Sequence, residues 1–117
     1  KFPPSTDAEA WGMANIISNF SLKQLIVTVP PLHAVRAFVS LISACGKNNL
    51  RDVAIWSAPS EAPPWDEIVF VSAYSPPAPR MKHVADELGK LMRYCDKGDH
   101  LTAREVLDYF VRRENIP

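Results

Sequence analysis

Proline is the residue that most constrains how this chain can fold. The 117 residues include 11 prolines but only 4 glycines, whereas globular proteins average about 5% proline and about 7% glycine. Proline lacks a backbone N–H and fixes φ at about −65°, so it stands at strand ends, in loops or in the first turn of a helix. Paired prolines at 30–31, 63–64 and 76–77 therefore divide the chain into short elements.

Two helices are predicted before residue 50. Thr6 and Glu9 have the spacing of a capping box, and apolar residues at helical spacing continue the first helix to about Asn19. Pro31 suits the first turn of the second helix, and Gly46 suits its C-cap. These signals predict one helix on each side of the first strand.

Two more helices are predicted after residue 80. The apolar positions of the first of them run from Met81 to Cys95 at helical spacing, and we expect its other face to lie in solvent. That solvent face comprises Lys82, His83, Asp86, Glu87, Lys90 and Arg93. Thr102 and Glu105 have capping-box spacing and mark the start of the last helix.

Three short runs rich in β-branched and aromatic residues are predicted to be strands, at 25–29, 50–56 and 67–74. The first is apolar on both faces, so we expect it at the centre of a sheet. Together with two helices these strands follow a split β-α-β-β-α order, which is typical of a ferredoxin-like sheet. We therefore predict an α+β fold with a three-stranded antiparallel sheet, an extra N-terminal helix and an extra C-terminal helix.

The length of the chain fits one domain, 1–117. Within it we expect an N-terminal helix extension at 1–20, an α+β core at 22–95 and a C-terminal helix at 101–115. The chain begins at Lys1 and not at Met, so we expect it to be part of a larger protein.

Five segments follow one another in an order that matches a known family. They are 25–31, 44–46, 50–55, 69–74 and 88–91. Across about 24–92 the chain resembles a degenerate RNA-recognition-motif domain through its hydrophobic pattern and its turns. The resemblance implies a ferredoxin-like sheet whose central strands carry aromatic residues that stack on RNA bases.

The chain departs from that family where the bases would stack. Ile26 stands at the first-strand position, and Ile68 and Phe70 occupy the two third-strand positions. Asp66-Glu67 replaces the basic opening of the family's motif. A single aromatic residue beside two carboxylates is a poor platform for RNA, so we expect the sheet face to bind protein instead.

The charge and the motifs of the chain exclude few functions, but none of them points to catalysis or to a bound metal or cofactor. The formal net charge is zero, which disfavours nucleic acid as a partner because that affinity comes mainly from clustered Lys and Arg. No metal-ligand spacing or glycine-rich loop occurs, so we expect no catalytic residue, metal or cofactor. The longest uncharged run, 25–35, is too short to span a membrane. Cys45 and Cys95 suit reduced thiols in an intracellular protein.

The leading hypothesis is a non-catalytic protein-protein interaction or self-association module. Its partner would be another protein or a second copy of the chain. We expect one sheet face to be formed by Ile26, Ile68, Phe70, Tyr74 and Trp56. These five residues and Trp65 are the candidate binding residues. For Trp56, burial under the N-terminal helix and a role as an interface anchor both stay open.

Two alternatives come from other functional classes. The first is a domain that binds single-stranded RNA through Lys23, Arg36, Arg51, Arg112 and Arg113. The second is a small enzyme, which would need Cys45 or Cys95 within reach of a histidine in a cleft.

Overall fold

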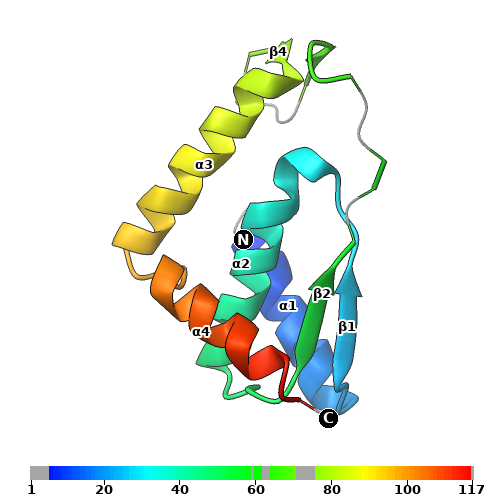
Figure 1. Ribbon diagram of the computed structural model, residues 1–117, viewed down its shortest axis with the longest axis vertical. Helices are drawn as coiled ribbons and strands as arrows, with labels where there is room; N and C mark the ends of the chain where they lie inside the picture. The colour runs from blue at the N-terminus through cyan, green and yellow to red at the C-terminus, as the bar shows by residue number, and fades with distance from the viewer. Residues whose placement is uncertain (1–5, 59, 62–63, 71–75, 117) are drawn as a thin grey trace.

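The computed structural model describes residues 6–58, 60–61, 64–70 and 76–116. This described part contains four helices and two small two-stranded sheets (Figure 1), which confirms the α+β class. In chain order the elements are α1 (Thr6–Asn19), β1 (Gln24–Val27), α2 (Pro31–Lys47), β2 (Ala54–Ser57), β3 (Ile68–Val69), β4 (Ala78–Pro79), α3 (Arg80–Asp96) and α4 (Ala103–Arg113).

The helix ends follow the sequence signals at two positions and depart from them at one. Pro31 opens α2 as expected. The capping box at the start of α4 is confirmed, since the Thr102 hydroxyl accepts from the Glu105 N–H. Gly46, however, lies inside α2, because Asn49 takes the left-handed conformation after the helix with φ 59° and asparagine tolerates that conformation. The side chain of Thr6, in the other predicted capping box, lies outside the described residues.

The predicted three-stranded antiparallel sheet is not present in the described residues. β1 pairs with β2 directly and in parallel, with Leu25 opposite Ile55. The third predicted strand, 67–74, contributes only β3, which pairs antiparallel with β4; residues 71–75 lie outside the described part. β1, predicted to be central, is therefore an edge strand. The prolines at 76, 77 and 79 explain the shortness of the second sheet, because they remove ladder donors.

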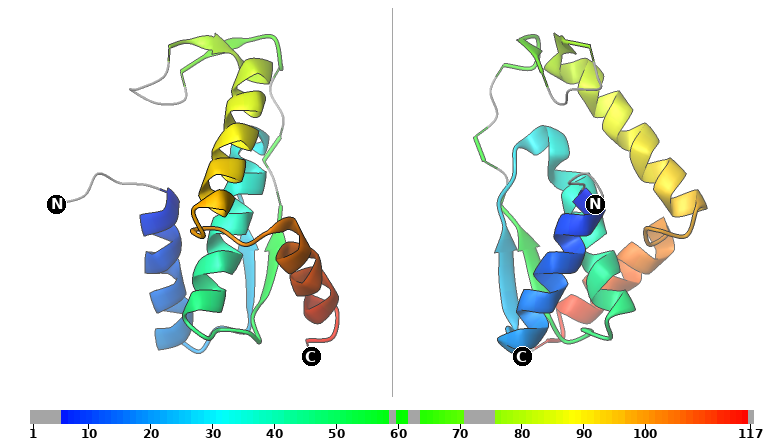
Figure 2. Two further views of the ribbon diagram at one scale, coloured as in Figure 1. Left: turned by 90° about the vertical axis from the view of Figure 1, so that its left-hand side faces the viewer. Right: turned by 180° about the vertical axis from the view of Figure 1, so that it is seen from behind.

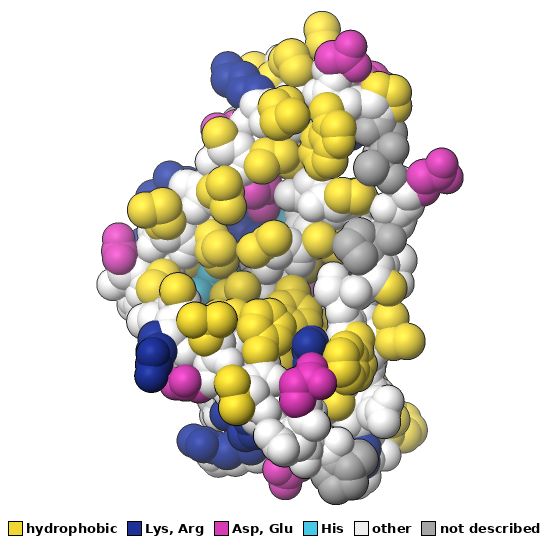
Figure 3. Space-filling view, in the orientation of Figure 1, with side chains coloured by type: hydrophobic (Ala, Val, Ile, Leu, Met, Phe, Trp, Pro, Cys, Tyr) yellow, Lys and Arg dark blue, Asp and Glu magenta, His cyan; other side chains and the backbone are white. Residues whose placement is uncertain are grey.

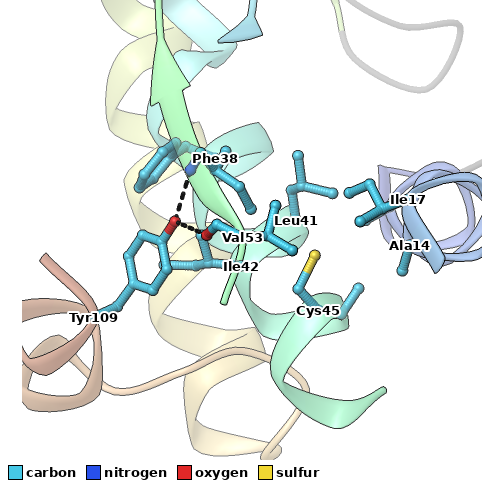
Figure 4. Close-up of a cluster of buried hydrophobic side chains, with 11 residues drawn as sticks. Ala14, Ile17, Phe38, Leu41, Ile42, Cys45, Val53 and Tyr109 are labelled. Atoms are coloured by element: carbon cyan, nitrogen blue, oxygen red, sulfur yellow. Dashed lines mark hydrogen bonds between the residues drawn. The ribbon is translucent and has the colours of Figure 1, made fainter. Parts of the chain in front are cut away.

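The helix α2 lies at the centre of the molecule. α1 and α2 pack side by side on one face of the β1–β2 sheet, whereas α4 lies along the outer side of β2 (Figures 1 and 2). α3 contacts α2 but stands apart from the sheet and α1 (Figure 2). The core between these elements is made of Ala10, Ala14, Ile17, Phe38, Leu41, Ile42, Ala44, Cys45, Val53, Ile55 and Tyr109 (Figure 4).

The outer edge of β2 is closed by side chains of α4. The Tyr109 hydroxyl accepts from the Ile55 N–H at 2.8 Å and donates to the Val53 carbonyl at 3.0 Å (Figure 4). Arg113 Nη1 donates to the Ile55 carbonyl at 3.0 Å. An edge strand exposes unpaired N–H and C=O groups that invite another strand. These bonds satisfy the groups of Ile55 at the middle of that edge and hinder further pairing there.

No helix in the described part of the chain is long and apolar enough to cross a membrane.

Tyr109→Phe tests whether the hydroxyl stabilises this edge. The substitution leaves the Ile55 N–H of β2 and the carbonyl of the preceding Val53 without their partner, so the free energy of unfolding should fall by about 1–3 kcal/mol. Urea denaturation followed by circular dichroism measures the change. Tyr94→Phe removes a hydroxyl from a half-buried tyrosine away from β2 and serves as the control. Equal losses in the two variants would contradict the role assigned to Tyr109.

Candidate functional site

A charged cluster holds α3 against α2. Arg36 donates through Nε and Nη2 to the two carboxylate oxygens of Glu87, the second bond being 3.2 Å long. His33 Nδ1 lies 3.3 Å from the same carboxylate. Burial on its own would raise the pKa of Glu87, but the hydrogen bonds with His33 and Arg36 and the Arg36 charge outweigh it and lower the pKa from 4.5 to about 2. Glu87 is therefore ionised and paired at neutral pH.

This pairing turns Glu87 inward from the polar side of α3, whereas Lys82, Asp86 and Arg93 of that side stay exposed. His83, expected on the solvent face, is only 2% exposed, and its Nε2 donates to the Val69 carbonyl at 3.1 Å. Glu87 was also expected in solvent and instead faces α2. Two residues of the predicted solvent face are thus inside, because a guanidinium on α2 and a carbonyl on β3 supply their partners.

Part of the apolar stripe of α3 faces solvent, whereas Val84, Leu91 and Cys95 are half-buried. Met81, Leu88 and Met92 are 59%, 49% and 68% exposed. With Ala85, which is also exposed, they form a row with spacings of four, three and four residues, which we call the α3 seam. Figure 3 shows hydrophobic side chains gathered over α3 and continuing toward α4. Such spacing is typical of a helix that packs against another helix, and this signal was available in the sequence.

An apolar pocket adjoins the α3 seam where α3 faces the start of α2. Its volume is about 110 Å³. It is lined by Pro31, Leu32, Val35, Arg36, Trp65, Val84, Glu87, Leu88 and Leu91. Trp65, a candidate from the sequence, therefore stands beside the seam. Leu88 belongs to both features, so pocket and seam form one continuous apolar surface.

The outer face of the β1–β2 sheet carries two other candidates. Ile26 and Trp56 are register partners on neighbouring strands, and they are 68% and 38% exposed. The guanidinium carbon of Arg113 lies 3.9 Å from the centroid of the Trp56 ring, a cation–π contact. Burial of Trp56 under the N-terminal helix is wrong, because α1 packs on the other face of the sheet.

The remaining candidates do not join that face. Ile68 lies in β3 of the second sheet, and Phe70 is the first residue after that strand. Both side chains are exposed. Tyr74 lies outside the described residues. The expectation that Ile26, Trp56, Ile68 and Phe70 share one sheet face is therefore wrong, because β3 pairs with β4 and not with β1 or β2.

The five basic residues of the RNA-binding alternative are partly engaged within the protein. Arg36 pairs with Glu87, Arg112 lies over the Tyr109 ring at 5.3 Å, and Arg113 contacts Trp56 and Ile55. Lys23 and Arg51 are exposed. Three of the five thus already contact other groups of the fold.

The thiols and histidines were the candidates for catalysis. Cys45 lies in the apolar core, where burial raises its pKa to about 11, so its thiol stays protonated at neutral pH. Cys95 is half-buried. The Ser40 hydroxyl and His100 Nε2 lie 2.9 Å apart, and both side chains are buried between α2 and the turn before α4. No group of three potential metal ligands occurs among the described residues.

Comparison of the chain with protein-family models, with curated proteins and with solved structures finds no match.

The pH dependence of stability tests the charged cluster. Between the ordinary pKa of 4.5 and the folded value of about 2, the unfolded chain binds more protons at Glu87 than the folded chain does. The stability due to its ionisation is therefore complete above about pH 4.5 and is lost as the pH falls toward about 2. Glu87→Gln should be less stable than the wild type at pH 7, and the difference should shrink across this window.

Urea denaturation at a series of pH values measures that difference, with the exposed Glu61→Gln as the control. A difference between Glu87→Gln and wild type that stays constant from pH 7 to pH 3 would contradict the ion pair as its cause.

Proposed function

We propose that the protein is a non-catalytic interaction module whose α3 seam binds an amphipathic helix of a partner protein. The observation that carries the proposal is the exposure of Met81, Leu88 and Met92 on a helix that turns His83 and Glu87 inward. Monomeric proteins rarely leave large contiguous apolar patches in water, and such patches mark binding sites.

The shape of the surface suits a helix better than a small molecule. The seam runs along the length of α3 with the spacing that an opposing helix matches. Val84 and Leu91 extend the apolar surface sideways into the pocket beside Trp65, so a side chain of the partner helix would fit there. Methionine side chains adapt to differently shaped partners, and the seam contains two of them.

The charges beside the seam predict weak dependence on salt. Lys82, Asp86, Arg93 and Asp96 are exposed along α3 and carry no net charge as a set. A partner helix would therefore gain little from long-range attraction, and the affinity would come mainly from apolar burial. Binding to RNA would behave oppositely, since its affinity falls steeply as salt rises.

A labelled synthetic helix tests the proposal. The probe is a 21-residue peptide with leucine at heptad positions a and d and alternating Glu and Lys elsewhere, and fluorescence anisotropy measures its affinity. Leu88→Lys should weaken binding at least tenfold, because burying a leucine contributes about 1.5–3 kcal/mol and about 1.4 kcal/mol corresponds to tenfold. The affinity should change little between 50 and 500 mM NaCl.

Two controls make the result specific to the α3 seam. A peptide of the same composition with its leucines scrambled should bind at least tenfold more weakly than the probe. Ile26→Lys, on the distant sheet, should bind the probe as the wild type does. Equal binding of both peptides, or full binding by Leu88→Lys, would refute the seam as the site.

A further inference from the structure

The two edges of the β1–β2 sheet differ. On the β2 side, Tyr109 and Arg113 of α4 bond three outward backbone groups, the Val53 carbonyl and the N–H and carbonyl of Ile55. On the β1 side, α1 packs over one face of the sheet and does not take up the edge (Figure 2). A two-stranded sheet is marginal without further strands or cover, so the uncovered side of β1 is the structurally incomplete part of this layer.

The outward groups of β1 can be assigned from its ladder with β2. The carbonyls of Lys23, Val27 and Val29 accept hydrogen bonds from the β2 side. Because backbone groups alternate along a strand, those of Gln24, Ile26 and Thr28 point away from β2. No hydrogen bond to the backbone N–H or C=O of these three residues occurs among the described residues.

This edge also lacks the features that usually prevent strand pairing. Edge strands are commonly guarded by charged side chains, proline or a bulge. Residues 24–29 contain no charged residue and no proline. Ile26, at the middle of the edge, exposes 68% of its surface.

The length of the free edge is set at both ends. The Leu22 N–H is already bonded to the Ile17 carbonyl at 3.0 Å, and Pro30 has no N–H to offer. The groups between them belong to Gln24, Ile26 and Thr28, so Ile26 is the midpoint. Because the free groups are placed symmetrically about Ile26, a two-fold rotation at Ile26 brings the donors of one β1 edge opposite the acceptors of a second β1 edge.

We propose that β1 pairs antiparallel with β1 of a second copy of this chain, about a two-fold axis at Ile26. Ile26 then faces Ile26 of the second copy, and Gln24 faces Thr28 in both directions. Each of these pairs exchanges two backbone hydrogen bonds. The product is a continuous four-stranded sheet of order β2-β1-β1-β2.

The side chains support this register. Ile26 neighbours Trp56 across the β1–β2 ladder, so one row of the shared sheet reads Trp56, Ile26, Ile26, Trp56. Aromatic and β-branched neighbours stabilise a sheet face. Lys23 lies opposite Val29 of the second copy, and no like charges face each other. A closed two-fold contact of this kind uses the same patch on both copies, which favours a second copy over an unrelated strand.

The dimer does not rest on the α3 seam, and its test separates the two surfaces. Analytical ultracentrifugation from about 5 to about 500 µM covers the range in which small interfaces associate. The sedimentation coefficient of the wild type should rise from that of a monomer to that of a dimer. Ile26→Lys, which places a natural edge guard on β1, should weaken dimerisation at least tenfold, whereas Leu88→Lys on α3 should leave it unchanged.

Amide hydrogen exchange on the unmodified protein gives a second readout that requires no substitution. The amides of Gln24, Ile26 and Thr28 should become protected as concentration rises, while those of Leu25 and Val27, which point toward β2, serve as internal controls. A monomer at 500 µM, a dimer lost in Leu88→Lys but kept in Ile26→Lys, or edge amides that stay unprotected in the dimer would overturn the proposal. If the dimer proposal fails, binding of the labelled helix by monomeric Ile26→Lys would still support the α3 seam as a binding site.

Discussion

The ion pair between Arg36 and Glu87 determines which side of α3 faces water. α3 has two sides that could pack against α2, one apolar and one polar. The guanidinium on α2 and the carbonyl of Val69 hold two residues of the polar side, Glu87 and His83, inward. An ion pair this sheltered contributes less net stability than its short distances suggest, because both partners lose water. What it supplies is orientation, and the exposed seam depends on that orientation.

At β2, too, a few side-chain contacts from a distant part of the chain determine the arrangement. Tyr109 and Arg113 reach β2 from a helix more than fifty residues further along the chain. Through them, α4 replaces the third strand that a ferredoxin-like sheet would place beside β2. The β1 edge has no such cover among the described residues, so the molecule presents two surfaces of different kinds: an apolar helix side and an unpaired strand.

Local patterns in the sequence locate the helices and part of their ends. Helical spacing predicts α3, and the capping box at Thr102 predicts the start of α4. Each of these signals is made by residues that are only a few positions apart in the chain. Strand pairing and helix rotation are decided by distant groups. Ile55 meets the Tyr109 hydroxyl across 54 residues of chain, and Arg36 meets Glu87 across 51. The candidate residues Ile26, Trp56 and Trp65 lie at the surface. Leu88 and Met92, which the pattern places opposite the expected solvent face, are exposed too, because apolar spacing alone does not say what covers a helix.

The closure of β2 by α4 has a consequence during synthesis. The chain is made from its N-terminus, so β1, α2 and β2 leave the ribosome before Tyr109 and Arg113 are attached to them. Until α4 docks, the Val53 and Ile55 groups that it later bonds are also unpaired, so both edges of the sheet lack a partner. Docking of α4 therefore completes the cover of β2. Before it docks, the strands of this chain are most prone to pair with strands of other chains.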